Sequence, residues 1–143
     1  MSVEIKKIGV GLDGSEASFK ALKEALDLAK KLGAEIVALH VLPIPTEFAD
    51  LGGMLVDVEA QLRNEAEAIL ARGAEEAKKK DVPYTGVILE GDIAESMANY
   101  AADKGLDLLV VGYQGKSKLS ELIMGSVTSR LLGISKVPVL VIK

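Results

Sequence analysis

The chain has 143 residues, a length at which one domain buries roughly 68–70% of the surface that its unfolded chain exposes. Hydrophobic residues make up 49% and charged residues 27%, which is ordinary for a globular protein and argues against disorder or a membrane class. The formal net charge of −4 argues against a general nucleic-acid binder, because phosphate affinity needs a basic surface.

The sequence also limits the compartment and the chemistry. It contains no cysteine, which excludes disulfides, thiol chemistry and thiolate zinc sites. No apolar stretch reaches the ~20 residues needed to span a bilayer, and the N-terminal segment lacks the apolar core of a signal peptide. With no internal repeat or low-complexity tract, residues 1–143 are expected to form one cytoplasmic domain without membrane or nucleic-acid partners.

Apolar runs of strand length recur five times along the chain. They are continuous rather than alternating, the pattern of strands that are buried on both faces of a sheet. The weakest run follows Val82 and Pro83. Strands are expected at 8–12, 36–42, 85–89, 106–111 and 137–142.

Two helices have clear start and stop signals. Apolar residues recur every three or four positions after Ser15, which can cap the helix, and this pattern ends at Gly33. Another helix opens with Asp92 and Glu95 at capping-box spacing and stops at Gly105. We therefore expect a helix between the first two strands and another between the third and fourth.

The remaining connections are less regular. Residues 43–56, PIPTEFADLGGMLV, contain two of the four prolines and a glycine pair, so a long mobile connection is expected there. A helix follows this connection, and a short helix is expected at about 126–132. The helix that follows residues 43–56 should carry one apolar face, made of Val58, Leu62, Ala66, Ile69, Leu70, Gly73 and Ala77.

Alternation of five strands with four helices implies right-handed crossovers and a parallel sheet covered by helices on both sides. The predicted fold is therefore α/β: a single-domain, open, doubly wound, Rossmann-like sheet of five parallel strands. In such sheets, ligands bind beyond the carboxyl ends of the strands, where the strand order reverses. This rule directs attention to the loops after Leu12, Val41 and Val111.

The segment GVGLDG matches the dinucleotide fingerprint G-x-G-x-x-G through Gly9, Gly11 and Gly14. Gly9, however, lies inside the apolar run rather than after it. The fingerprint also needs an acidic residue at the end of the second strand to bind a ribose hydroxyl, and residues 39–42 supply none. We therefore reject a dinucleotide site.

Asp13, at the carboxyl end of the first strand, allows two interpretations. Its carboxylate can accept hydrogen bonds from a ribose hydroxyl or an amine. The sequence DGS also favours a turn, in which Asp13 would serve the backbone alone. The residue by itself does not decide between them.

The most informative stretch is VVGYQGKSKLSELIMGSV, residues 110–127. Gly112 ends the fourth strand, Gly115 follows it, and Gly125 with Ser126 opens the last helix. Glycines let backbone amides approach an anion, and a helix N-terminus favours phosphate. The alternative is that the glycines only make turns and that Ser126 is only an N-cap residue.

The spacing G-x2-G-x9-G-S resembles the ATP-binding motif of the universal stress protein family. The likeness covers the whole chain and includes Asp13, the segment ALHVL at 38–42 and the ending VPVLVIK. It implies ATP, or AMP, as the ligand, with an adenine pocket near Leu12, Asp13 and Val41.

The resemblance also assigns the other end of the site. It implies strand-end contact from Val111 and Gly112, and phosphate contact from Gly115, Gly125, Ser126 and Val127. This chain departs from the family at Gln114, where the family often has a basic or small polar residue, so a charge toward phosphate is lost. Lys116 or Lys118 could partly replace it, and Mg²⁺ could be held through the phosphates by Asp13 or Ser126.

Other chemistries find little support. A Walker loop would need a glycine at position 110, which is Val110. His40, the only histidine, lies in an apolar strand and is expected to be a packed strand residue. No constellation for nucleophilic catalysis or for metal binding is visible.

The resulting hypothesis is an ATP-binding module for stress response or signalling. A slow ATPase of the same fold and a nucleotide-free interaction protein remain alternatives. We also expect a homodimer through the apolar final strand, 137–142, because Pro138 favours a sheet edge and an open apolar edge invites pairing.

Overall fold

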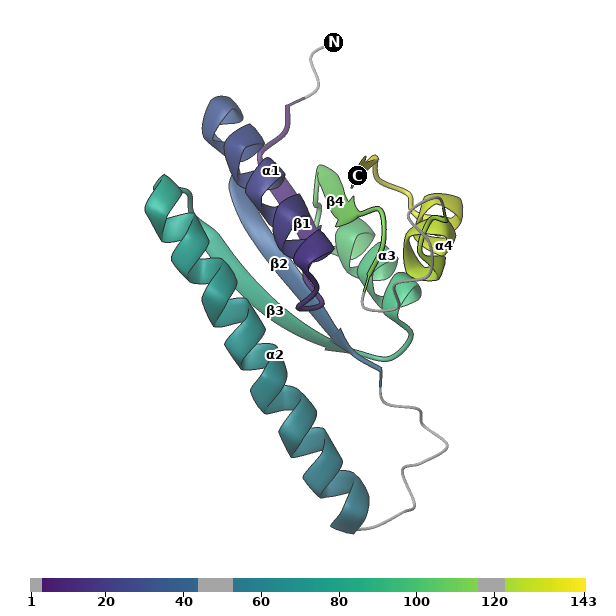
Figure 1. Ribbon diagram of the computed structural model, residues 1–143. Helices are drawn as coiled ribbons and strands as arrows, with labels where there is room; N and C mark the ends of the chain where they lie inside the picture. Colours follow the sequence, from purple (N-terminus) through teal and green to yellow (C-terminus); the bar gives the residue numbers. More distant parts are fainter. Residues whose placement is uncertain (1–3, 44–52, 116–122) are drawn as a thin grey trace.

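The computed structural model describes residues 4–43, 53–115 and 123–143. Five parallel strands form one sheet in the order β3-β2-β1-β4-β5 (Figure 1), which confirms the predicted doubly wound α/β fold. The strands are β1 (Lys7–Gly11), β2 (Glu35–Leu42), β3 (Tyr84–Glu90), β4 (Leu108–Gly112) and β5 (Val139–Ile142). The helices are α1 (Glu16–Leu32), α2 (Gly53–Lys80), α3 (Ile93–Asp103) and α4 (Ser126–Ile134).

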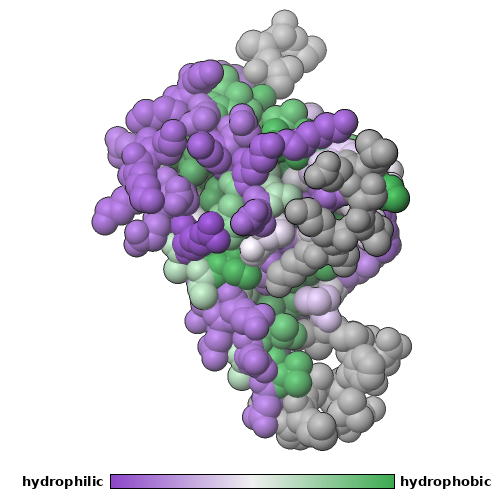
Figure 2. Space-filling view, viewed as in Figure 1, coloured by the Kyte–Doolittle hydropathy of each residue, from purple (hydrophilic) through white to green (hydrophobic). Residues whose placement is uncertain are grey.

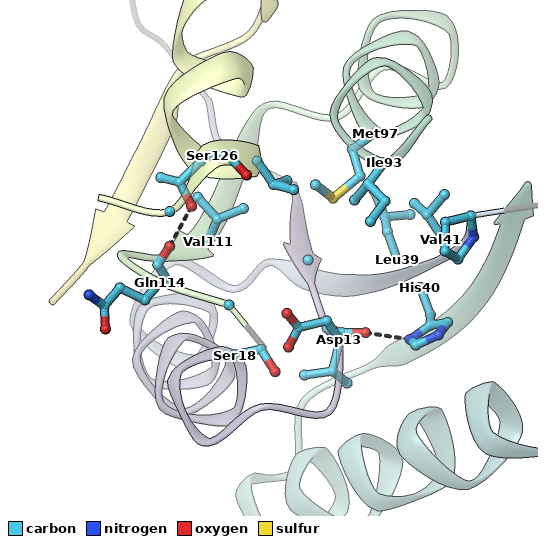
Figure 3. Close-up of a pocket in the computed structure, with 18 of the residues that line it drawn as sticks. Asp13, Ser18, Leu39, His40, Val41, Ile93, Met97, Val111, Gln114 and Ser126 are labelled. Atoms are coloured by element: carbon cyan, nitrogen blue, oxygen red, sulfur yellow. Dashed lines mark hydrogen bonds between the residues drawn. The ribbon is translucent and has the colours of Figure 1, made fainter. Parts of the chain in front are cut away.

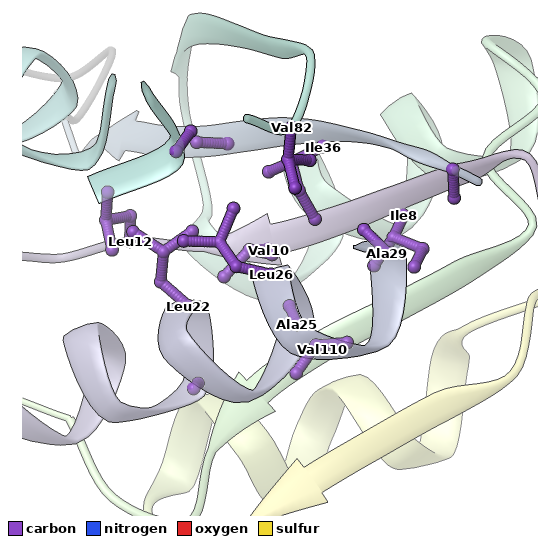
Figure 4. Packing of buried hydrophobic residues seen from close by; sticks show 14 of the residues in the cluster. Ile8, Val10, Leu12, Leu22, Ala25, Leu26, Ala29, Ile36, Val82 and Val110 are labelled. Carbon is purple, nitrogen blue, oxygen red and sulfur yellow. The ribbon is translucent and has the colours of Figure 1, made fainter. Parts of the chain in front are cut away.

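The helices cover the two faces of the sheet in pairs. On one face, apolar side chains of α1 and α2 pack against Ile8 and Val10 of β1 and Val110 of β4 (Figure 4). On the other face, α3 and α4 pack against a second cluster that includes Leu39 and Leu109. The outward side of α1 is largely hydrophilic (Figure 2), as expected for a helix with one buried face. The central strands β1, β2 and β4 are thus buried from both sides, as predicted. The edge strands β3 and β5 are only partly buried, so the prediction is wrong for these two.

The predicted start and stop signals of α1 and α3 are confirmed. The hydroxyl of Ser15 accepts a hydrogen bond from the amide of Ser18 at 3.1 Å, and Gly33 closes α1 with a φ of 68°. A left-handed residue at this position suits glycine because it has no Cβ. The Asp92 carboxylate accepts from the amide of Glu95 at 3.0 Å and caps α3.

The prediction for residues 43–56 is wrong at its end. Helix α2 begins at Gly53, so 53–56 are helical, and residues 44–52 lie outside the described part. The buried face that we expected for α2 is also too long, because Val58 is 51% exposed. The N-terminal part of α2 extends past the ends of β2 and β3 (Figure 1). Within the described residues, no helix has the length and apolar character to cross a membrane.

A glycine in α2 makes room for a half-buried tyrosine. The Tyr84 hydroxyl donates to the backbone oxygen of Leu70 at 2.7 Å, and burial raises the pKa of Tyr84 to about 12. A Cβ on Gly73 would lie 2.5 Å from that hydroxyl oxygen. The tyrosine therefore packs against the bare backbone of α2.

We predict that Gly73→Ala lowers the free energy of unfolding by about 1–2 kcal/mol, although alanine is the better helix former. The test is a double-mutant cycle by urea denaturation. In a Tyr84→Phe background, the same substitution should cost clearly less, because the clashing oxygen is gone and only the Leu12 Cδ2, at 3.0 Å, and the ring Cζ, at 3.2 Å, still crowd the new Cβ. Equal losses in both backgrounds would contradict the account.

Candidate functional site

A cavity of about 270 Å³ opens at the carboxyl ends of β1, β2 and β4 (Figure 3), close to the roughly 300 Å³ at which ligand pockets begin. From β1 the chain proceeds to β2 on one side, and β4 pairs with β1 on the other, so the strand order reverses here. This is where open α/β sheets bind ligands. The loops after Leu12, Val41 and Val111 all contribute to it, as predicted.

The structure places the candidate residues around this one cavity. Lys116 lies outside the described residues, as does Lys118. Whether the others bind a ligand remains a prediction. The candidates that line the cavity are Leu12, Asp13, Val41, Val111, Gly112, Gln114, Gly115, Gly125, Ser126 and Val127.

One wall of the cavity is apolar. Leu39 and Val41 reach it from β2, and Ile93 and Met97 from the first turns of α3, with Val111 at the end of β4 (Figure 3). These side chains offer no charge and little hydrogen bonding, so they suit a flat, weakly polar ring.

Asp13 combines both interpretations that the sequence left open. Its Oδ1 accepts a hydrogen bond from the amide of Ser15 at 2.8 Å, which makes a turn before α1. Its Oδ2 lies at the cavity beside Gly115, since a Cβ on Gly115 would lie 2.8 Å from that oxygen. One oxygen therefore holds the turn, and the other has no hydrogen-bond partner among the described residues and lies at the cavity.

The glycine-rich loop is closed at its neck by hydrogen bonds. The amide of Gly125 donates to the oxygen of Tyr113 at 2.9 Å, and the Gln114 side-chain amide donates to the oxygen of Ile123 at 2.9 Å. The buried Thr128 hydroxyl donates to the oxygen of Gly112 at 2.8 Å and ties α4 to the end of β4. Gln114, which the sequence predicted as a binding residue without the family's frequent charge, therefore also has a structural role.

Helix α4 directs its N-terminus at the cavity. Gly125, not Ser126, is the N-cap residue, so the interpretation of Ser126 as an N-cap is wrong. Ser126, Val127 and Thr128 form the first turn, and their amides precede any acceptor within the helix. Free amides at a helix N-terminus form an anion site.

Charge around the cavity is mainly acidic. Among the described lining residues, the charged side chains are Asp13 and Glu65, the latter on α2. Attraction for an anion therefore comes, within the described part, from the backbone amides of α4 rather than from lysine or arginine.

His40 is buried, as expected of a packed strand residue, yet it also lines the cavity.

The periodicity of the sequence did not predict that α2 and α3 supply part of the cavity wall. The only signal was that Asp92 begins α3 directly after a strand, at the carboxyl edge of the sheet. Lining residues outside the sequence-based candidates are Gly11, Ser18, Leu39, His40, Leu42, Pro43, Leu62, Glu65, Ile93, Met97 and Thr128.

Comparison with known proteins identifies relatives over the full length. Residues 4–143 match the model of the universal stress protein family. Universal stress protein YxiE of Bacillus subtilis is 32% identical, over 96% of this chain and 98% of that protein. Universal stress protein MJ0577 of Methanocaldococcus jannaschii is 30% identical, over all of this chain and 98% of that one.

Solved structures resemble this chain in the same way. The structure of MJ0577 superposes with a TM-score of 0.88 at 29% identity and covers 99% of this chain and 97% of its own. A universal stress protein family protein from Arabidopsis thaliana, solved with AMP bound, superposes with a TM-score of 0.72 over 96% of this chain and 91% of its own. At 18% identity, that second likeness shows the fold alone.

Proposed function

The chain belongs to the universal stress protein family, and on this basis we propose that it binds an adenine nucleotide, ATP or AMP, as a stress-response or signalling module. The observation that carries the proposal is that one cavity holds an apolar wall, an outward carboxylate oxygen and a helix N-terminus. These three features match the base, the ribose and the phosphate of one ligand. A relative of the same fold holds AMP, which supports the ligand class.

The base fits the apolar wall. Ile93 and Met97 lie one helical turn apart on α3 and form one wall with Leu39 and Val41 of β2 (Figure 3). A purine against this wall removes apolar surface from water, at about 25 cal/mol per Å². Gly11 lies at the base of this wall, because a Cβ there would be 3.0 Å from the Met97 sulfur.

The ribose fits beside Asp13. An ionised carboxylate only accepts hydrogen bonds, and the two ribose hydroxyls are donors. Because Oδ1 already accepts from Ser15, Oδ2 is the atom that remains for the ligand. The turn holds the carboxylate in place before any ligand arrives.

The phosphates fit between Gly115 and the first turn of α4. There the amides of Ser126 and Val127 and the Ser126 hydroxyl are the donors. We include Mg²⁺ only as an ion carried by the phosphates. The described residues contain no cluster of three or more His, Asp or Glu side chains that could hold a metal, so a nucleotide would supply most of its ligands.

Two broader parts of the proposal concern location and assembly. We place the protein in the cytoplasm, in line with the sequence-based expectation. We also propose a homodimer through β5, which lies at an edge of the sheet. Mass spectrometry of protein purified without added nucleotide tests the central claim, because a bound adenine nucleotide should travel with it.

We predict that Asp13→Ala weakens adenosine and AMP binding about 10- to 100-fold, the range for loss of hydrogen bonds to a charged group. Tripolyphosphate binding should be unchanged, since it does not reach the ribose position. Titration calorimetry with both ligands measures the difference.

Asp13→Asn separates the two roles of this residue. Asparagine keeps an oxygen that can accept from the Ser15 amide, so the turn should survive, but the carboxylate toward the ribose is lost. We expect Asn to weaken AMP binding nearly as much as Ala does, with less loss of thermal stability. Equal losses for AMP and tripolyphosphate would point to a disturbed loop instead of a ribose contact.

A further inference from the structure

The end of β1 departs from the regular parallel ladder at one carbonyl group. The amide of Leu12 donates to the oxygen of Leu39 at 2.9 Å, which continues the pairing of Gly11 with Leu39. In a parallel ladder, the next bond would run from the amide of Val41 to the oxygen of Leu12. No such bond joins these described residues.

The side chain of His40 takes that place. Its Nδ1 lies 2.7 Å from the oxygen of Leu12 (Figure 3). A carbonyl oxygen has only lone pairs to offer, so Nδ1 must carry the hydrogen and donate it. In the neutral ring, the hydrogen on Nδ1 leaves Nε2 as an acceptor.

This hydrogen bond acts on the peptide unit that leads into Asp13. The oxygen of Leu12 belongs to the Leu12–Asp13 peptide, and the amide on the other side of Leu12 is held by Leu39. Both peptide planes that flank Leu12 are therefore anchored to β2. The residue that follows presents its Oδ2 to the cavity.

A second consequence concerns Val41. Even-numbered residues of β2 bond to β3, as shown by Ile36, whose amide donates to Pro83, and Leu42, whose oxygen accepts from Gly91. The amide of Val41 is therefore directed to the β1 side. Since His40 occupies the oxygen of Leu12, that amide has no partner among the described residues and lies at the cavity that Val41 lines.

We propose that His40 is a positioning residue of the binding site: by taking the Leu12 carbonyl out of the strand ladder, it orients Asp13 and keeps the Val41 amide open to a ligand. The expected effect of His40 on ligand binding rests on the proposed nucleotide site, whereas the hydrogen bond from its Nδ1 to the oxygen of Leu12 does not. His40 also retains contact with solvent, because the described part contains no buried side-chain nitrogen without a partner.

The geometry can be tested without any ligand or variant. His40 is the only histidine in the chain, so ¹⁵N-histidine labelling gives the signals of one ring. At about pH 8, where an ordinary histidine is neutral, we expect a protonated Nδ1 and an unprotonated Nε2, the less common tautomer of free histidine. A ring with its hydrogen on Nε2 would overturn the proposal.

The consequence is tested by two matched amide variants. Asparagine can place its N–H₂ near the position of Nδ1, whereas glutamine, one methylene longer, places it near Nε2. We expect His40→Asn to bind AMP within about threefold of wild type and His40→Gln about tenfold more weakly, the scale of one buried hydrogen bond. Tripolyphosphate binding should stay unchanged in both.

The outcomes separate the two proposals. Equal AMP affinities for Asn and Gln, with both variants folded, would show that the ring only fills space and would overturn the positioning role. A wild-type protein that binds no adenine nucleotide would instead contradict the proposed function, while the tautomer in the ligand-free protein still decides the geometry. Should either variant fail to fold, the wild-type tautomer remains decisive.

Discussion

Replacement of Gly125 by valine is expected to weaken ATP binding by at least about 100-fold while the protein remains folded. Gly125 caps α4 with extended backbone, φ −60° and ψ 149°, which valine can adopt. A Cβ at this position would lie 3.3 Å from the Cα of Gln114 and 3.5 Å from the amide nitrogen of Gly115. The branched side chain therefore occupies the space between the loop and the helix N-terminus.

The size of the effect follows from what the phosphates lose. Each hydrogen bond from an amide to a charged group contributes about 1.5–3 kcal/mol, so loss of two reaches 100-fold, which is about 2.7 kcal/mol. Stability should fall by about 1–3 kcal/mol, because valine is a poorer N-cap residue than glycine and its Cβ crowds the backbone of Gln114. Titration calorimetry and thermal unfolding measure the two quantities separately.

Gly133→Val is the matched control for this substitution. Gly133 lies in the same helix, and nothing approaches within 4 Å of a Cβ built there. The identical change of side chain should leave ATP affinity at the wild-type value. If folded Gly125→Val also bound ATP like wild type, the phosphates would have to bind elsewhere.

Local signals in the sequence were enough to predict the elements that carry the site. Helix starts are marked by the side-chain oxygens of Ser15 and Asp92, and a helix end by Gly33, which has no side chain. These effects do not depend on distant residues. Pro138 likewise predicted an edge position for the last strand, since proline cannot donate to a ladder, and β5 is at an edge.

The walls of the cavity could not be predicted in the same way. Periodicity shows that Leu62 lies on the apolar face of a helix, but not which strand ends that face meets. The same limit applies to Ile93 and Met97, which were not singled out, although their helix was. Tertiary packing decides these contacts.

The role of His40 depends on register, which also escapes a reading of one sequence. An apolar strand with one histidine predicts burial, and His40 is 8% exposed. Only the pairing of Gly11 with Leu39 places the ring beside the Leu12 carbonyl. A shift of one residue would turn the imidazole to the other face of the sheet.

Leu140→Glu is expected to convert a homodimer of this protein into monomers, lowering the association constant at least about 100-fold. Among the described residues, β5 pairs with β4 on one side only, so its other edge presents backbone groups that no described strand pairs. Its side chains are apolar on both faces: Val139 and Val141 lie with the α3–α4 cluster, and Leu140 on the opposite side is 40% exposed. An open apolar edge is a template for a second strand.

Two copies of this edge can pair around a two-fold axis, the commonest closed assembly. Glutamate at position 140 would then bring two carboxylates into one seam and remove them from water. Leu140 is a sharper test than Val141, because Val141 also packs within its own chain and its loss would disturb the fold.

Leu32→Glu is the matched control: this leucine ends α1, is 47% exposed and belongs to no strand edge. Sedimentation at micromolar concentration should show dimers for wild type and Leu32→Glu, and monomers for Leu140→Glu. A monomeric wild type would mean that β5 is not an interface and that its edge stays open.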